Sequence, residues 1–147
     1  MGLSDLLREA PVSLLPSRLA GREVRVLDPR YRPVDLEITV CIEAGHMPSE
    51  VRDRVLRRIR GDGETPGLYD AESLTFGTPI YRLTLEAALR ALLGVRAVKR
   101  VKIAARGLHS IREMEMVYRV PEYQILRLAN DPRFPERGSV KVFTEGG

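Results

Sequence analysis

The sequence has 147 residues, of which 44% are hydrophobic and 30% charged, with a formal net charge of +4 and a pI near 9.6. This is typical of one globular domain that folds without disulfides or a metal. A single cysteine, Cys41, excludes an internal disulfide and fits a reducing compartment. The N-terminus lacks a signal-peptide pattern, and no apolar run approaches the roughly 20 residues of a membrane span. We therefore expect a soluble, cytoplasmic protein without a membrane partner.

Residues 1–30 contain too few apolar side chains to form a core, so they are predicted to be an N-terminal arm or linker. The clearest element is a strand at residues 34–42, where aliphatic and polar side chains alternate. A period of two is typical of a strand with one face in the core and the other facing solvent or a partner. The aliphatic row consists of Val34, Leu36, Ile38, Val40 and Ile42.

A helix is predicted from Pro48, whose missing N–H is harmless in a first turn, to the stop signal Gly61. A loop rich in glycine and proline then covers residues 61–79, and a loop of this length is usually functional or tied down. A second amphipathic helix is expected at residues 80–93, before Gly94. The apolar stripe of the first helix consists of Val51, Val55 and Ile59.

Three further strands are expected at residues 98–105, 114–120 and 139–144, with a rigid turn region at 130–138. The order strand, helix, helix, strand, strand, strand predicts an α+β fold. We expect a two-layer sandwich in which two helices cover one face of a mostly antiparallel sheet of about four strands. This assembly domain would span residues 31–147.

No motif in the sequence points to catalysis, metal binding or a cofactor. The two histidines, His46 and His109, lack metal-ligand spacing, and Cys41 lies inside a predicted strand, where a structural role is commoner than catalysis. Asp35 and Glu37 share a strand face, but any solvated strand face shows that pattern. Phosphate-binding and nucleophile-elbow signatures are absent. We therefore expect no catalytic residue, no metal and no cofactor, in a protein that is not an enzyme.

The most basic stretch lies on the first helix, at residues 50–60. Acidic residues partly neutralise its arginines, so a solvated or protein-binding face is the favoured interpretation. The alternative function is a nucleic-acid-binding α/β domain that uses this helix. Recognition of RNA by the sheet is disfavoured, because the strands at 34–42 and 98–105 contain no aromatic side chains for stacking. A third possible function is that of a small-ligand regulatory domain with a similar fold.

Several segments, taken together, resemble the C-terminal part of the baseplate J-like proteins, the putative baseplate assembly proteins of contractile phage tails and phage-tail-like injection systems. The match runs from about residue 15 to the end of the sequence. The segments that carry it are residues 29–34 (PRYRPV), 42–45 (IEAG), 74–81 (LTFGTPIY), 94–95 (GV) with Val98, and 128–138 (LANDPRFPERG).

The resemblance implies a structural role without catalytic residues. Its members are wedge subunits of a baseplate ring that surrounds a central hub and anchors a contractile sheath. The partners it implies are other baseplate or wedge proteins, and sheath or hub proteins, within a multimeric ring. Nucleic acid is not among the expected partners.

Two rigid, apolar loops are the candidate interface, because preformed surfaces bind at low entropic cost. Arginines near the second loop offer bidentate contacts to acids of a neighbouring protein. The alternative is that these side chains fold back and cap their own domain. The candidate residues are Leu74, Phe76, Pro79 and Tyr81 in the first loop, and Leu128, Arg133, Phe134, Pro135 and Arg137 in the second.

Overall fold

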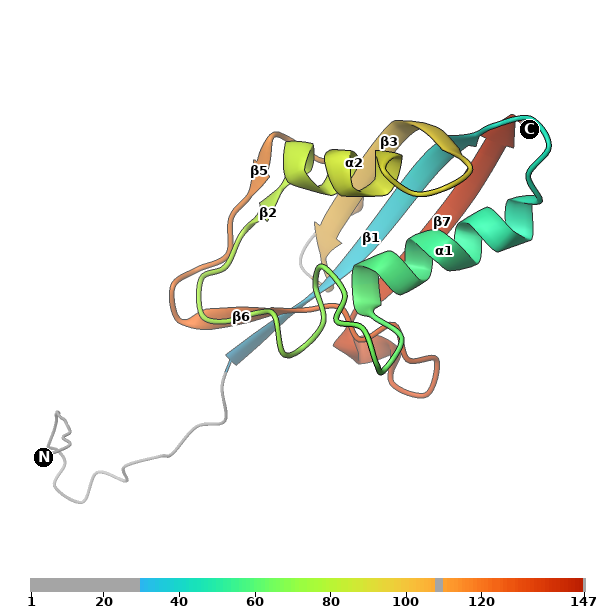
Figure 1. Cartoon of the computed structure of the whole chain (residues 1–147). Coiled ribbons are helices and arrows are strands. Elements are labelled where there is room, and N and C mark those ends of the chain that lie inside the picture. Colours follow the sequence, from blue (N-terminus) through green and yellow to red (C-terminus); the bar gives the residue numbers. More distant parts are fainter. Residues whose placement is uncertain (1–29, 108–109, 147) are drawn as a thin grey trace, which may run out of the picture.

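The computed structural model describes residues 30–107 and 110–146 (Figure 1). The predicted arm at residues 1–30 lies outside the described part of the chain, apart from Arg30. The elements are, in chain order, β1 (Arg30–Ile42), α1 (Pro48–Arg60), β2 (Ile80–Tyr81), α2 (Arg82–Arg90), β3 (Val95–Ala105), β4 (Arg112–Glu113), β5 (Val117–Tyr118), β6 (Gln124–Arg127), the short 3-10 helix η1 (Pro135–Arg137) and β7 (Ser139–Gly146).

The central strand of the fold is β1. Along one edge it pairs antiparallel with β3, and β4 pairs antiparallel with the far edge of β3. Along its other edge, β1 pairs in parallel first with β6 and then with β7. The predicted α+β class is confirmed. The sheet has five strands and is mixed, whereas we expected about four strands in a mostly antiparallel sheet. Alternation of side chains predicts a strand but does not encode its direction.

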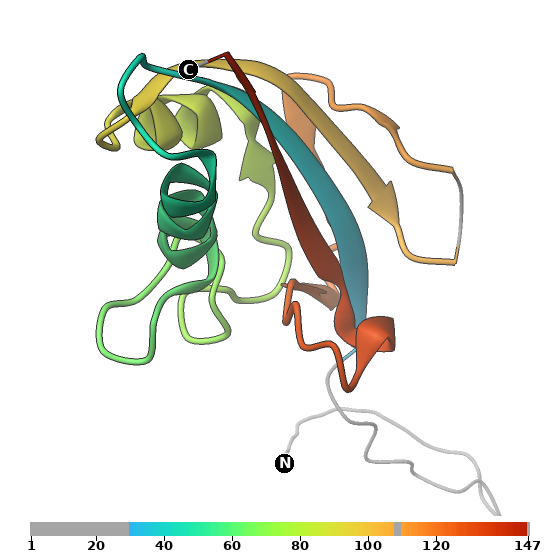
Figure 2. The same cartoon turned by 90° about the vertical axis from the view of Figure 1, so that its right-hand side faces the viewer.

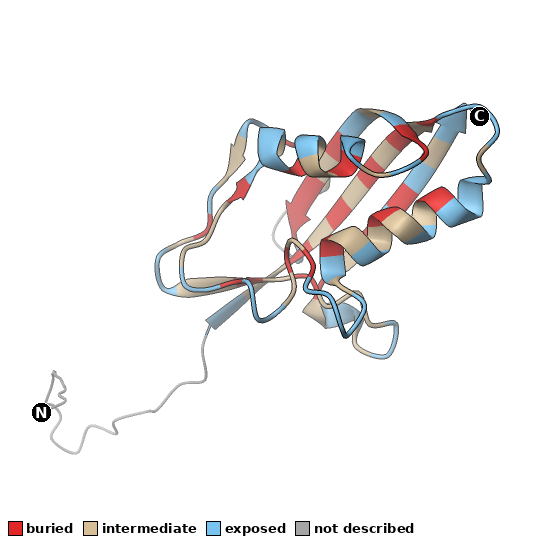
Figure 3. Cartoon of the chain, viewed as in Figure 1, coloured by how far each residue is buried: buried red, intermediate tan, exposed pale blue. Residues whose placement is uncertain are grey.

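The hydrophobic core lies between the sheet and the two helices. The aliphatic row of β1 is buried, with exposed fractions between 0 and 2%, and it faces the buried stripe of α1. Figure 2 shows both helices on the same side of the sheet, and Figure 3 shows buried residues alternating along the strands beneath them. The opposite face of the sheet carries no element of the described chain, so we call it the open face. The expected two-layer arrangement is therefore present.

The prediction of a single strand at residues 114–120 is wrong. The chain instead forms the two-residue strands β4 and β5, which belong to different sheets. Met114 is buried and its N–H donates to the Val101 carbonyl at 2.8 Å, after which the chain leaves β3. The next part of the chain, β5, pairs with β2. Because residues 80–81 form β2, helix α2 begins at Arg82 and not at residue 80, where it was predicted to begin. None of the helices in the described ranges is long and apolar enough to cross a membrane.

Candidate protein-interaction surface

A two-stranded ribbon projects beside the main sheet. It consists of residues 75–81 and 117–125, which run antiparallel through the β2–β5 pair and an isolated bridge between Phe76 and Ile125. The Gly77 N–H also donates to the Gln124 carbonyl at 2.8 Å. The ribbon forms the left border of the molecule in Figure 1. Two segments that lie about 40 residues apart in the sequence are thereby held together as one rigid unit.

The ribbon and its junction with α2 carry most of the large exposed apolar side chains of the described chain, Phe76 and Tyr123 near one end and Tyr81, Leu83 and Met116 near the other. Five of the nine large hydrophobic side chains that are exposed in the described ranges lie here, each between 51 and 62% exposed. Isolated exposed hydrophobics are normal, whereas a cluster of them marks an interaction site. Two members were predicted from the sequence and three were not. We call the five the apolar ribbon surface: Phe76, Tyr81, Leu83, Met116 and Tyr123.

The three residues that sequence reasoning missed reach this surface through tertiary pairing. Met116 precedes β5, and its carbonyl accepts the Arg82 N–H at 2.9 Å. Leu83 lies in the first turn of α2, and Tyr123 lies two residues before Ile125, the bridge partner of Phe76. Local sequence carries no signal of this proximity, because it depends on the pairing of distant segments.

For two of the predicted interface residues the prediction is wrong, because they belong to the core. Leu74 is 9% exposed and Leu128 is 4% exposed. They line the same small, mostly apolar cavity of about 200 Å³, together with Tyr69. Burial there raises the pKa of Tyr69 to about 12. For these two leucines the chain folds back on its own domain, as the alternative interpretation stated. Pro79 is half-buried on the ribbon.

The second predicted loop closes on itself. Residues 129–138, which we call the closed loop, are joined at their base by two backbone hydrogen bonds. The Ala129 N–H donates to the Arg137 carbonyl at 3.1 Å, and the Asn130 N–H donates to the Gly138 carbonyl at 3.0 Å. Asn130 adopts a positive φ of 50° and accepts the Val140 N–H through its Oδ1 at 3.0 Å.

Three of the four charged side chains of the closed loop, those of Asp131, Arg133 and Arg137, are engaged within it. The Arg133 guanidinium donates to both carboxylate oxygens of Asp131, at 3.2 and 3.0 Å. This pairing lowers the pKa of Asp131 and raises the pKa of Arg133. The Arg137 guanidinium lies 4.0 Å from the centre of the Phe134 ring, and that of Arg133 lies 5.6 Å from it. Pro135 is exposed. The arginines predicted to reach a neighbour are therefore already engaged locally.

The arginines of α1 are divided between packing and solvent. The Arg54 Nη1 donates to the Leu93 carbonyl at 2.5 Å and thereby ties α1 to the turn that follows α2. Arg52 and Arg58 are half-buried, while Arg57 and Arg60 are exposed. The helix thus does not present all of its arginines to a ligand.

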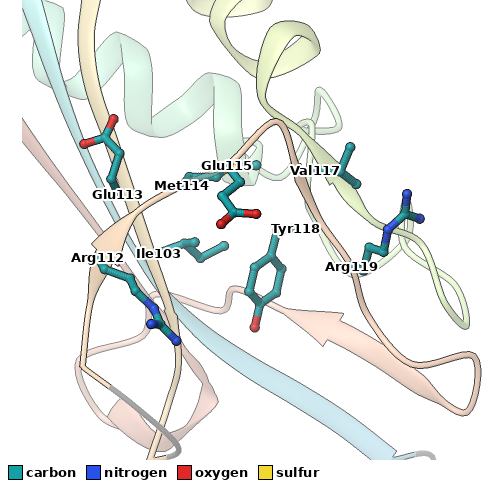
Figure 4. Close-up of a pocket in the computed structure, with 8 residues that line it drawn as sticks. All are labelled: Ile103, Arg112, Glu113, Met114, Glu115, Val117, Tyr118 and Arg119. Atoms are coloured by element: carbon teal, nitrogen blue, oxygen red, sulfur yellow. The ribbon is translucent and has the colours of Figure 1, made fainter.

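A cleft of about 480 Å³ opens between β3, β4 and the segment that leads to β5 (Figure 4). The Tyr118 ring points into it beside Ile103, and its buried hydroxyl has no hydrogen-bond partner in the described part of the chain. Among the described residues that line it, none is a serine, cysteine or histidine. The lining residues are Ile103, Arg112, Glu113, Met114, Glu115, Val117, Tyr118 and Arg119.

The residues considered for metal or thiol chemistry lie apart. Cys41 is a free, half-buried thiol on the open face of the sheet. His46 is half-buried in the turn after β1, against Gly94, and His109 lies outside the described residues. Within residues 30–107 and 110–146, no three side chains of histidine, cysteine, aspartate or glutamate gather as metal ligands would.

Comparison with protein families and with curated proteins found no match. No protein-family model matches the chain, and no curated protein matches it significantly.

Proposed function

We propose that this chain is a non-enzymatic assembly module of a contractile, phage-tail-like baseplate, a wedge-subunit module that acts through protein–protein contacts. The observation that carries the proposal is the apolar ribbon surface. Two of its members, Phe76 and Tyr81, lie in a segment through which the sequence resembles baseplate J-like proteins. The partners would be neighbouring wedge, hub or sheath proteins of the same ring.

The composition and rigidity of the ribbon support a binding role. Tyrosine, phenylalanine and methionine are enriched at the centres of protein interfaces, and a few such side chains supply most of the binding energy. The ribbon is held by its own backbone pairing, so little conformational entropy is lost when a partner docks.

Co-expression with the proteins encoded beside it is the test of this proposal. We expect the chain to co-purify with sheath, tube and wedge proteins, and to be present in assembled particles seen by electron microscopy. The double substitution Phe76→Ser and Tyr81→Ser should reduce co-purification at least tenfold. Met47→Ser is the matched control, because Met47 is equally exposed, at 59%, but lies away from the ribbon.

Two results would contradict the proposal. Particles that assemble normally without the chain would remove the structural role. Tight, salt-dependent binding to DNA or RNA that is lost in Arg57→Glu and Arg60→Glu would instead support the alternative, in which α1 binds nucleic acid.

A further inference from the structure

The last strand, β7, has a long open edge. All eight of its residues pair in parallel with β1, and no strand of the described chain pairs with its other edge. At the start of that edge, the Val140 N–H donates to the Asn130 side chain at 3.0 Å. The N–H and C=O of a strand residue point to the same edge, and the direction alternates along the strand. Val142 and Thr144 therefore also direct their backbone groups to the open edge.

The pairing of β1 shows independently which residues of β7 direct their backbone groups to the open edge. The Pro33 carbonyl accepts the Arg106 N–H at 2.9 Å on the side of β3, so the even-numbered residues of β1 face β7. In a parallel ladder, a residue that faces its neighbour bonds to the two residues that flank its register partner. Leu36 has Val140 as its partner, so the odd-numbered residues of β7 bond to β1. The even-numbered residues of β7 are left for the open edge.

The other edges of the sheet are protected, which sets β7 apart. The outer edge of β6 is met by the ribbon, through the Phe76 to Ile125 bridge and the Gly77 N–H. The outer edge of β3 is partly covered by β4, and its register with β1 is broken by two irregularities. Bulges are a common protection of edge strands, whereas the register of β7 is unbroken and contains no proline. An unprotected edge is a template for strand addition.

Helix α1 covers this edge, because it packs over β7 on the core side of the sheet (Figures 1 and 2). Arg54 donates to the Leu93 carbonyl and so faces α2. The opposite flank of α1, with Arg52 and Leu56, therefore faces the open edge, and Leu56 is partly buried against the core. A strand added to β7 would place every second side chain on the core side of the sheet, and the one nearest Leu56 would be aliphatic.

The remaining side chains of an added strand would meet basic residues. All three lysines of the sequence belong to the strands of the open face: Lys99 and Lys102 in β3 and Lys141 in β7. Lys99 is paired with Glu145 at 2.6 Å. Lys102 and Lys141 are both register partners of Glu37, and Lys102 is also the register partner of Glu113, which pairs with Arg82. This leaves an excess of positive charge beside β7 that complements an acidic side chain.

We propose that β7 binds an extended segment of a partner protein as an added strand, and that this segment alternates aliphatic and acidic residues. The backbone groups of Val142 and Thr144 form the new ladder. The aliphatic side chains pack under Leu56, and an acidic side chain pairs with Lys141 on the open face. This surface is separate from the apolar ribbon surface, so either can fail without the other.

A second copy of the chain does not fit this edge. Because α1 lies over β7, antiparallel pairing of two β7 strands with both helix layers on the same face would bring the two α1 helices into the same space. Packed helices need roughly 8–10 Å between their axes, which is about twice the spacing of neighbouring strands. The occupant is therefore a strand without a covering helix at that edge.

Amide hydrogen exchange of the ¹⁵N-labelled chain tests the proposal directly. In the free chain, the amides of Val142 and Thr144 should exchange at least tenfold faster than those of Lys141 and Phe143, which bond to β1. The probe is the blocked peptide Ac-Thr-Val-Glu-Val-Glu-Val-Thr-NH₂. At saturation, it should slow exchange at Val142 and Thr144 at least tenfold. A peptide with lysine in place of glutamate should bind at least fivefold more weakly.

Matched variants separate the edge from the rest of the fold. Thr144→Pro removes an outward N–H without removing a bond to β1, so it should abolish peptide binding, whereas Thr144→Val should retain it. Lys141→Glu should weaken binding at least fivefold, more than Lys102→Glu on the more distant β3. Unchanged protection of the β1 amides shows that each variant is folded. Phe76→Ser with Tyr81→Ser should leave peptide binding intact.

Three outcomes would overturn the proposal. They are slow exchange at Val142 and Thr144 in the free chain, no change at these amides with a tenfold excess of peptide, and equal binding by Thr144→Pro and Thr144→Val.

Discussion

The apolar ribbon and the closed loop differ in how they use similar residues. Both come from proline-bounded segments with an aromatic residue near the centre, and both were predicted to be interface loops. The ribbon obtains its rigidity from backbone pairing with a distant segment, which leaves its side chains free to point outward. The closed loop is joined by backbone hydrogen bonds within itself. Its side chains also engage one another, since Asp131 pairs with Arg133 and the Phe134 ring lies against both arginines.

The difference shows that a rigid loop presents a binding surface only where its side chains are not already engaged with one another. In the closed loop, a partner that captured Arg133 would have to compete with Asp131. On the ribbon, a partner would find Phe76 and Tyr81 without a local competitor. The closed loop is therefore better explained as a structural element that connects β6 to β7.

The largest expected effect separates buried from exposed members of the two loops. Leu128→Ala should lower the free energy of unfolding by about 2–5 kcal/mol, because it removes a buried side chain beside an existing cavity. Phe76→Ala should change it by about 0.5 kcal/mol or less, as surface substitutions do. Urea denaturation measures both values. Equal losses would mean that Phe76 is part of the core and not of a binding surface.

The next largest effect is expected from a glycine substitution in the closed loop. Gly138 has a φ of +95°, and an added Cβ would lie 2.5 Å from the Arg127 carbonyl oxygen and 2.8 Å from that of Val34. Gly138→Ala should therefore cost about 2–4 kcal/mol through backbone strain and collision.

The control is Gly63→Ala. Gly63 has a similar φ of +94° but nothing within 4 Å of its added Cβ, so only the strain of about 1–2 kcal/mol remains. Thermal and urea unfolding compare the two. If both variants lose the same stability, the close approach of β1 and β6 to the loop does not matter.

Much of the main sheet and both helices could be predicted from the sequence, because their signals are local. The aliphatic row of β1 and the stripe Val51, Val55 and Ile59 are periodic, and burial of one face requires that period. The ends of α1 followed from Pro48 and Gly61 for equally local reasons.

The features that could not be predicted depend on pairing between distant segments. Parallel pairing of β7 with β1 leaves no trace in the alternation of either strand. The segment at 114–120 has strand-forming residues, but Met114 pairs with β3 while Val117 pairs with β2, which splits it. The burial of Leu74 and Leu128 likewise arises because two loops meet at one cavity.

A smaller effect is expected where the ribbon joins α2. The Arg82 side chain donates to the Met114 carbonyl and pairs with Glu86 at 2.7 Å and with Glu113 at 2.9 Å. Arg82→Gln should lower the free energy of unfolding by about 1–2 kcal/mol. It should also speed amide exchange at Met114, whereas Arg90→Gln, at an exposed position of the same helix, should do neither. Unchanged exchange in Arg82→Gln would show that backbone pairing alone holds the ribbon.

The smallest effect concerns the pH dependence of the closed loop. The hydrogen bonds from Arg133 hold the pKa of Asp131 below its ordinary value. A carboxyl group with a lowered pKa in the folded state contributes stability above its unfolded pKa, near 4, and loses it as the pH falls through the folded value. The Asp131 carboxyl resonance, followed by NMR, should therefore titrate at a lower pH than an ordinary aspartate in the native chain. Arg133→Gln should return it towards the ordinary value, while Arg137→Gln should shift it less, because Arg137 acts only through its charge. An Asp131 titration that is the same in all three proteins would show that the closed loop is not held by this pair.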